Sequence, residues 1–137
     1  MNLYLDIDGV LLTTKIPVAV DGSESFIQFI TAHFNCFWLT THCKGDSTTV
    51  ISYLSNYYRP EILTELKKIH STNWSTLKTE GINLRSDFFW IEDFPLNAER
   101  KILQNYRKED GLIVSDLSSP NELNRIQQLL FLKSRKQ

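Results

Sequence analysis

The chain has 137 residues, 42% of them hydrophobic and 23% charged, and a mass of 16.0 kDa. This balance is typical of one folded domain, which we expect over residues 1–137, and it excludes a disordered tail protein. Because 15 basic residues face 16 acidic ones, the net charge of -1 provides no overall positive field for nucleic acid or anionic lipid. Any nucleic-acid binding would have to be local.

The two cysteines and the absence of a long apolar stretch bear on location. Cys36 and Cys43 are too few for a zinc site built from several thiolates, and a domain of this size needs no disulfide to fold. No apolar segment approaches the roughly 18 residues of a membrane span, and the first apolar stretch contains Asp6 and Asp8. We therefore expect a cytoplasmic protein with no signal peptide, no membrane span and reduced thiols.

In the first half of the chain, short apolar runs alternate with helical patterns. Residues 3–7 form an apolar run that predicts a buried strand. Ser23 is placed to cap a helix, and the aromatic-rich run at residues 34–39 predicts a second strand. Two more helices are predicted, one with Asp46 as its N-cap and one with Pro60 in its first turn.

The second half continues the alternation. Strands are predicted at residues 88–91 and 112–114, with a helix capped by Asn97 between them. Ser119-Pro120-Asn121-Glu122 has the spacing of a capping box, with proline at the first position of a terminal helix. Residues 70–86 show no clear pattern. Because parallel strands require crossover connections, we expect an α/β fold with a Rossmann-like parallel sheet and helices on both faces.

Acidic and hydroxyl side chains follow three of the predicted strands. Asp6 and Asp8 end the first, Thr40 ends the second, and Glu92 and Asp93 end the third. The ligand crevice of an open α/β sheet lies beyond the carboxyl ends of its strands. Two unit charges about 4 Å apart repel by about 4 kcal/mol at an effective dielectric of 20, so such a cluster implies a bound cation or shifted pKa values. Carboxylate ligands together with a substrate phosphate favour Mg²⁺.

The order of these residues resembles the haloacid dehalogenase (HAD) superfamily of phosphohydrolases. Its first motif is matched by Asp6-Ile7-Asp8-Gly9-Val10-Leu11, its second by Leu39-Thr40, its third by a lysine, and its fourth by Ile91-Glu92-Asp93. The match spans roughly residues 3–130. The resemblance implies a HAD-like fold and a Mg²⁺-dependent phosphatase acting on a phosphorylated substrate.

The resemblance also implies a role for each motif residue. Asp6 would attack phosphorus to give an aspartyl-phosphate intermediate. Asp8 would protonate the leaving oxygen and later deprotonate the attacking water. Thr40 and Lys78 would hold the transferring phosphoryl oxygens.

For the metal, the resemblance implies that Glu92 and Asp93 bind Mg²⁺ together with Asp6 and the backbone carbonyl of Asp8. Glu92 departs from the pattern of the family, in which the fourth motif of this kind of protein usually reads Asp-Asp. The extra methylene group is expected to move the metal or to be absorbed by a bound water.

Several residues near the motifs have alternative interpretations. Thr41 is the register alternative to Thr40, while Lys67 and Lys68 are predicted to lie on a solvated helix face rather than in the site. For His42 and Cys43 we favour an ordinary loop histidine and thiol over a role in the site.

The stretches between motifs are too short for an independent cap domain. By analogy with the family, a capless protein has an open site suited to large substrates or to closure by a partner. Residues 13–22 are expected to form a small flap over Asp6. Two other functions share these residues: a catalytically silent HAD-like binding or regulatory module, and a phosphotransferase. A response-regulator receiver fits less well, because no lone aspartate ends a middle strand.

Overall fold

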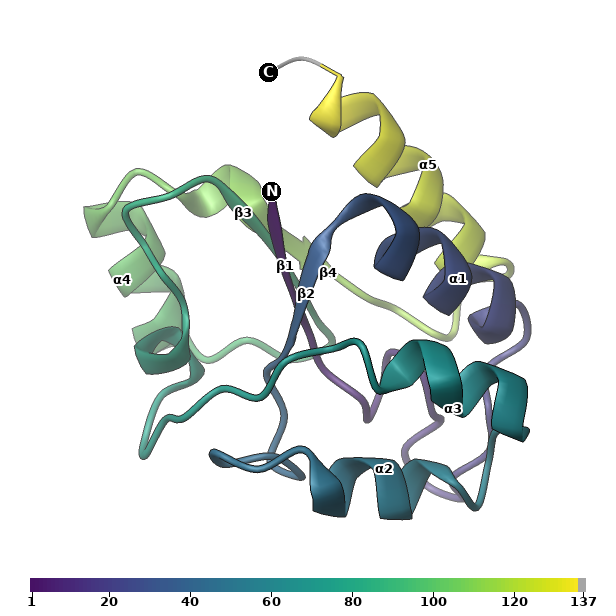
Figure 1. Cartoon of the computed structure of the whole chain (residues 1–137). Coiled ribbons are helices and arrows are strands. Elements are labelled where there is room, and N and C mark those ends of the chain that lie inside the picture. Colours follow the sequence, from purple (N-terminus) through teal and green to yellow (C-terminus); the bar gives the residue numbers. More distant parts are fainter. Residues whose placement is uncertain (136–137) are drawn as a thin grey trace.

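Four parallel strands form a single sheet in the order β2-β1-β3-β4. The strands are β1 (Asn2–Leu5), β2 (Asn35–Trp38), β3 (Phe88–Glu92) and β4 (Leu112–Val114). Figure 1 shows this sheet in a computed structural model, which describes residues 1–135. The predicted parallel α/β sheet is confirmed, and all four strands form where the apolar runs lie.

Five α-helices and two short 3₁₀ helices connect and cover the strands. The α-helices are α1 (Ser23–His33), α2 (Thr48–Leu54), α3 (Pro60–Leu66), α4 (Asn97–Asn105) and α5 (Glu122–Ser134), and the 3₁₀ helices are η1 (Lys78–Gly81) and η2 (Glu109–Gly111). Within residues 1–135, none of these helices has the length and apolar character needed to cross a membrane.

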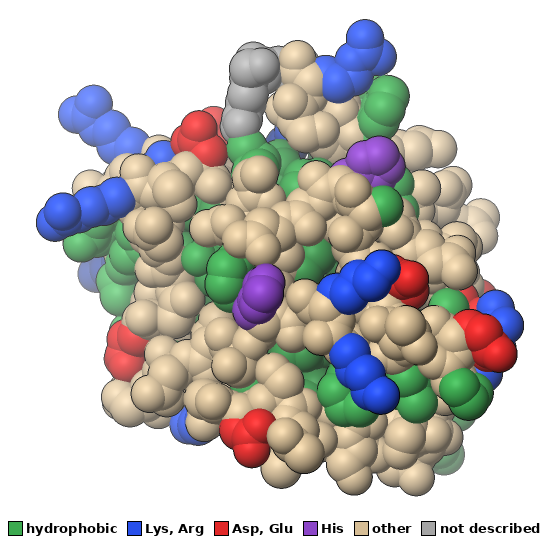
Figure 2. Space-filling model, viewed as in Figure 1, with side chains coloured by type: hydrophobic (Ala, Val, Ile, Leu, Met, Phe, Trp, Pro, Cys, Tyr) green, Lys and Arg blue, Asp and Glu red, His purple; other side chains and the backbone are tan. Residues whose placement is uncertain are grey.

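Helices cover both faces of the sheet, as expected. Successive side chains of a strand point to opposite faces, and the strands here are apolar on both. Leu3 and Leu5 belong to the larger hydrophobic cluster, which includes residues of α1, α3 and α5, whereas Tyr4 belongs to a smaller cluster with Leu103 of α4. Figure 1 accordingly shows α4 on one side of the sheet and α1 and α5 on the other. On the face shown in Figure 2, basic and acidic side chains are interspersed.

Residues 70–72, at the start of the segment that had no clear pattern, lie along the outer edge of β2. The His70 N–H donates to the Cys36 carbonyl (2.9 Å), and the Trp38 N–H donates to the His70 carbonyl (2.8 Å). Thr72 continues the contact with a hydroxyl hydrogen bond to the Trp38 carbonyl (2.5 Å). These bonds satisfy backbone groups of an edge strand, which otherwise remain open to pairing with another chain. The segment then enters η1.

Two of the predicted helix caps are each wrong by one residue. The N-cap of α1 is Gly22 (φ 81°) rather than Ser23, whose hydroxyl instead bonds Tyr58 of a distant loop. The N-cap of α4 is Leu96 rather than Asn97, because the Glu99 carboxylate accepts the Leu96 N–H (2.8 Å). The Ser23 hydroxyl thus has a partner that is distant in the sequence, whereas Glu99 lies only three residues after the cap that it supports.

The predicted start of α5 is also wrong. The helix begins at Glu122 with Asn121 (φ 57°) as its N-cap, so Pro120 lies outside it. Glu122 is buried, and its carboxylate accepts the Asp116 N–H (2.7 Å) and pairs with Arg125 (2.6 Å). These contacts close the loop before the helix and displace its start.

Of the other two helix starts, that of α3 agrees with the sequence, whereas the predicted N-cap of α2 is wrong by one residue. Pro60 occupies the first turn of α3, as predicted. The N-cap of α2 is Ser47, one residue after the predicted Asp46, but the Asp46 carboxylate does accept the Thr48 N–H (2.9 Å). Asp46 therefore supplies the capping hydrogen bond from one position earlier.

Tyr58 ties the loop after β1 to the start of α1. Its buried hydroxyl donates to the Leu11 carbonyl (3.1 Å) and lies 3.0 Å from the Ser23 hydroxyl. Burial raises the pKa of Tyr58 to about 12.

We expect Tyr58→Phe to lower the free energy of unfolding by about 1–2 kcal/mol, because two buried polar groups lose a partner. Urea denaturation measures this, and Tyr106→Phe, at an exposed position, should change it by less than about 0.5 kcal/mol. Equal values for the two variants would contradict the assignment.

Candidate functional site

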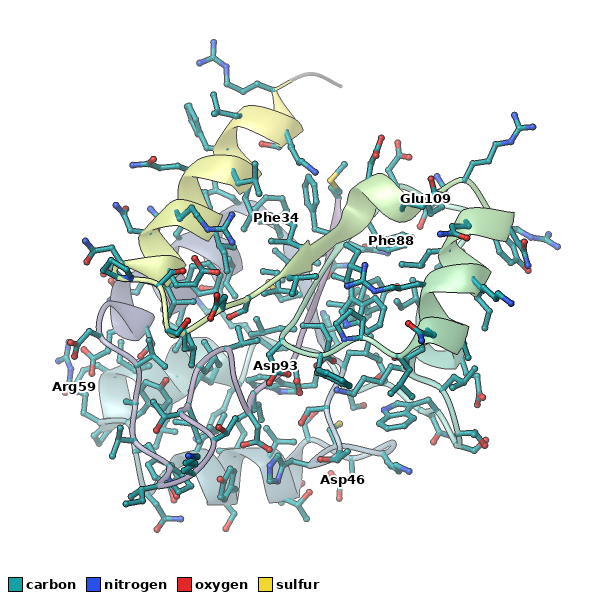
Figure 3. The ribbon with its side chains drawn as sticks, turned by 180° about the vertical axis from the view of Figure 1, so that it is seen from behind. Phe34, Asp46, Arg59, Phe88, Asp93 and Glu109 are labelled. Carbon is teal, nitrogen blue, oxygen red and sulfur yellow. The ribbon has the colours of Figure 1, made fainter. Side chains whose placement is uncertain are left out.

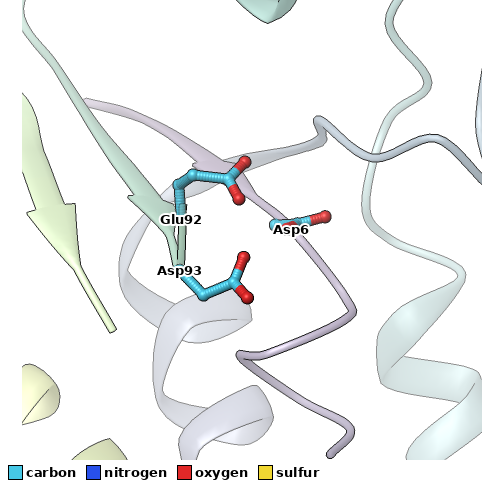
Figure 4. A group of neighbouring side chains, drawn as sticks. All are labelled: Asp6, Glu92 and Asp93. Atoms are coloured by element: carbon cyan, nitrogen blue, oxygen red, sulfur yellow. The ribbon is translucent and has the colours of Figure 1, made fainter. Parts of the chain in front are cut away.

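Three carboxylates meet at the carboxyl end of the sheet. Asp6 follows β1, Glu92 ends β3 and Asp93 comes next, and the parallel register places Leu5 beside Ile91 on these neighbouring strands. One oxygen from each of the three acids lies within 4.8 Å of the others. Figure 4 shows the three side chains directed toward one another. In Figure 3, Asp93 lies at one end of β3 and Phe88, the first residue of the strand, lies at the other. Asp6 and Glu92 are only 5% and 3% exposed.

Lys78 provides the positive charge of this cluster. Its ammonium nitrogen lies 2.6 Å from Glu92 Oε1 and 3.4 Å from Asp6 Oδ1, and its side chain is 14% exposed. Lys67 and Lys68 are exposed after α3, as predicted for a solvated face. The structure therefore brings Lys78, among the lysines considered, to the acids.

Two glutamates outside the motifs bind the backbone at and just before Lys78. Buried Glu99 of α4 accepts the Lys78 N–H (2.7 Å) with the carboxylate that also accepts from Leu96. Glu80 accepts backbone N–H groups of residues 75–77, which lead into η1, and these bonds lower its pKa to about 2. The capping-box spacing from Leu96 to Glu99 was the available signal for Glu99, but it says nothing about Lys78.

The cluster contains more acidic than basic groups, and their pKa values are shifted. Burial raises the pKa of Asp6 although Lys78 opposes it, and burial followed by the charge of Asp6 raises the pKa of Glu92. Burial and the neighbouring Glu92 raise the pKa of Asp93 to about 6. Burial lowers the pKa of Lys78, but the charges of Asp6 and Glu92 outweigh it and raise that pKa overall. Three ionised carboxylates and one ammonium sum to two negative charges, which a divalent cation would neutralise.

Gly9 allows the chain to pass beside Asp93. Its φ is +80°, and a Cβ atom at this position would lie 2.1 Å from Asp93 Oδ2. The Gly9 carbonyl accepts a hydrogen bond from the buried Ser115 hydroxyl (2.8 Å), which ties the loop after β1 to the end of β4. Both the backbone conformation and the close approach therefore require glycine.

The second aspartate of the first motif has different surroundings. Asp8 is not one of the three clustered acids, and its Oδ2 lies 2.9 Å from His42 Nε2. Thr40 is fully buried, and its hydroxyl accepts the His42 N–H (3.3 Å), whereas Thr41 is exposed. The structure thus places Cys43 in the hydrophobic core, as an ordinary buried thiol, and His42 against a motif residue.

The expected flap at residues 13–22 is part of a tight two-stranded turn. Leu12 bridges Ala19 in antiparallel fashion, and the Thr13 N–H donates to the Val18 carbonyl (3.0 Å). The turn borders an open hollow of about 340 Å³ that reaches the acidic cluster. The hollow is lined by Gly9, Thr13, Thr14, Asp93, Ser115, Asp116, Leu117 and Ser118. A larger hollow of about 490 Å³ lies by the start of β3, at the other end of the sheet from the acids.

Comparisons of the chain with protein-family models, with curated proteins and with solved structures found no match.

The raised pKa of Asp93 predicts a pH-dependent stability. Between about pH 4 and about pH 6 the folded state holds a proton that the unfolded state, with a pKa near 3.8, has released. The contribution of Asp93 to the free energy of unfolding therefore falls as pH rises through this window. Urea denaturation should show a smaller fall for Asp93→Asn than for the wild type, and parallel curves would contradict the expectation.

The same charges predict stabilisation by Mg²⁺. At neutral pH, a concentration about 100 times the dissociation constant should add about 2.7 kcal/mol to the free energy of unfolding. Gly9→Ala should lose this gain, because its Cβ displaces Asp93. Gly22→Ala is the matched control: its φ is +81° but its Cβ would meet no atom within 4 Å. Both variants should lose about 1 kcal/mol to backbone strain, and Gly9→Ala should lose more because Asp93 must also move. In thermal melts, only Gly22→Ala should keep the Mg²⁺ effect. A full Mg²⁺ effect in Gly9→Ala would remove Asp93 from the cation site.

Proposed function

We propose that this chain is a Mg²⁺-dependent phosphatase of the haloacid dehalogenase type that hydrolyses phosphate monoesters through an aspartyl-phosphate. The observation that carries the proposal is the environment of Asp6. Its buried carboxylate lies 3.4 Å from the Lys78 ammonium and shares a 4.8 Å cluster with two further carboxylates. A carboxylate beside a positive charge and a cation site, at the carboxyl end of a parallel sheet, suits attack on phosphorus.

The first step transfers the phosphoryl group to Asp6. An Asp6 carboxylate oxygen forms a bond to phosphorus while the bond from phosphorus to the ester oxygen breaks. The electron pair of the broken bond stays on the ester oxygen, which takes a proton from the carboxylic acid form of Asp8 and leaves as an alcohol. Lys78 and the Thr40 hydroxyl stabilise the charge that spreads over the transferring oxygens.

The second step restores the enzyme. A water oxygen forms a bond to phosphorus as its proton passes to the Asp8 carboxylate, and the bond between phosphorus and Asp6 breaks. Inorganic phosphate leaves, Asp6 is again a carboxylate, and Asp8 again carries the proton that the next leaving group needs. Asp8 is suited to both transfers because its side chain is 43% exposed, in contrast to 7% for Asp6.

Asp6, Glu92 and Asp93 are the residues that would hold Mg²⁺, which supplies charge neutralisation and orientation of the phosphate oxygens. The Glu92 carboxylate also forms an ion pair with Lys78 (2.6 Å). The glutamate that replaces the first residue of the usual Asp-Asp motif therefore also binds the lysine. We place the chain among the capless proteins of the HAD type, with a site open to its substrate. The free, buried cysteines support a cytoplasmic location.

The proposal is tested by phosphate release from an aryl phosphate with Mg²⁺ or with a chelator. Asp6→Asn should reduce turnover by at least about a thousandfold, because an amide is a poor nucleophile, and it should fold at least as stably because a buried charge is removed. Exposed Asp21→Asn is the control and should keep full activity.

Each alternative has its own outcome in this experiment. Turnover that persists in Asp6→Asn would contradict the proposal. A melting shift with Mg²⁺ but no turnover would indicate a silent binding module. Phosphoryl transfer to an added alcohol, faster than release to water, would indicate a phosphotransferase.

A further inference from the structure

His42 is held rigidly in the turn that follows β2. Its N–H donates to the Thr40 hydroxyl (3.3 Å), and its carbonyl accepts a hydrogen bond from the Thr49 hydroxyl (3.2 Å). The next residue, Cys43, donates its N–H to the Thr40 carbonyl (3.1 Å) and is buried in the core. The position of the His42 backbone is thus determined from both sides.

The His42 ring is oriented by aromatic neighbours on and after α2. It stacks on Tyr53 with ring centroids 4.3 Å apart and an interplanar angle of 14°. Tyr53 in turn meets Tyr57 edge-on, with centroids 5.4 Å apart. Stacked rings resist rotation, so the ring nitrogen that faces Asp8 has a defined direction.

That nitrogen is the one hydrogen-bond partner of the Asp8 carboxylate within residues 1–135. His42 Nε2 lies 2.9 Å from Asp8 Oδ2, which leaves Oδ1 without such a bond. The Asp8 side chain is 43% exposed and contacts no other charged group at this distance, so without His42 it would be free to rotate.

We propose that His42 is a positioning residue for Asp8: by binding Oδ2, the stacked imidazole directs Oδ1 toward the leaving oxygen of the substrate. The inference rests on the proposed phosphatase function. It implies that His42 matters most for esters of alkyl alcohols, whose strongly basic leaving oxygen must receive a proton as the bond to phosphorus breaks. A nitrophenyl ester needs little such help, because nitrophenolate is a stable leaving group.

The test compares turnover of an alkyl phosphate, glycerol 2-phosphate, with that of 4-nitrophenyl phosphate. His42→Phe keeps an aromatic ring for Tyr53 but removes the nitrogen. Its kcat/KM, which reports the steps up to loss of the leaving group, should fall about 10- to 100-fold for the alkyl ester and stay within about twofold of the wild type for the aryl ester. The later attack of water on the aspartyl-phosphate is common to both esters, so any loss in that step lowers kcat for both. His42→Gln, whose amide can donate one hydrogen bond, should recover part of the loss.

His33→Phe is the matched control, because His33 also lies against an aromatic ring, that of Phe29 (4.8 Å), on an exposed part of α1. It should leave both rates unchanged. Should His42→Phe not fold, His42→Leu carries the same expectation of selective loss.

A structural role for His42 would lower kcat/KM for both esters together. An equal loss of kcat/KM on the two esters, or no loss on either, would therefore overturn the inference while leaving the phosphatase function standing. A wild-type rate equal to that of Asp6→Asn on both esters would instead overturn the proposed function, and this inference with it.

Discussion

The buried contact of Lys78 with Glu92 and Asp6 is the interaction on which the rest of the site depends. Without the ammonium, two nearly inaccessible carboxylates would face each other and Asp93 in a region of low dielectric, where unpaired charge is expensive. Removing one partner of such a group leaves the other charges uncompensated, which costs more than the intact pair contributes. The backbone of Lys78 is held by Glu99 of α4, which accepts its N–H. A helix on one face of the sheet therefore helps to place the ammonium that compensates the carboxylates at the end of the sheet.

Strand order explains why residues far apart in the sequence share this environment. β1 lies between β2 and β3, so the residues that follow it contact residues that follow both neighbours. Asp6 therefore meets the acids after β3, while Asp8 meets His42 after β2. The Ser115 hydroxyl after β4 binds the Gly9 carbonyl and completes the set. A different order of the same four strands would separate these groups and leave the motifs without a common site.

The parts of this arrangement that local pattern determines were predictable, and the parts that depend on distant partners were not. The apolar runs placed the strands, and the acids at their ends followed directly. Lys78 followed from no apolar run and was favoured through the order of the motifs in the resemblance. The cap at Ser23 was misassigned because its hydroxyl bonds the distant Tyr58. The caps at Asn97 and Ser119 were misassigned although the carboxylates that act there, those of Glu99 and Glu122, bond residues close in the sequence. Residues 70–86 gave no period, and several of their hydrogen bonds are long-range: those of His70 and Thr72 reach β2, and the Asn83 N–H donates to Tyr4 of β1 (3.0 Å). Such long-range pairing leaves no local signature.

The two aspartates of the first motif show how a sheet end can separate two chemical roles over two residues. Asp6 lies buried at the edge of the sheet, where burial raises its pKa and the Lys78 ammonium opposes that rise. A cation bound beside Lys78 would balance the remaining negative charge. Asp8 lies beyond the edge, more exposed, with an imidazole as its partner. Two carboxylates in different environments can act as nucleophile and proton carrier, whereas two in the same environment would compete for one role. The separation comes from strand order, which puts Lys78 and the acids after β3 beside Asp6, and His42 after β2 beside Asp8.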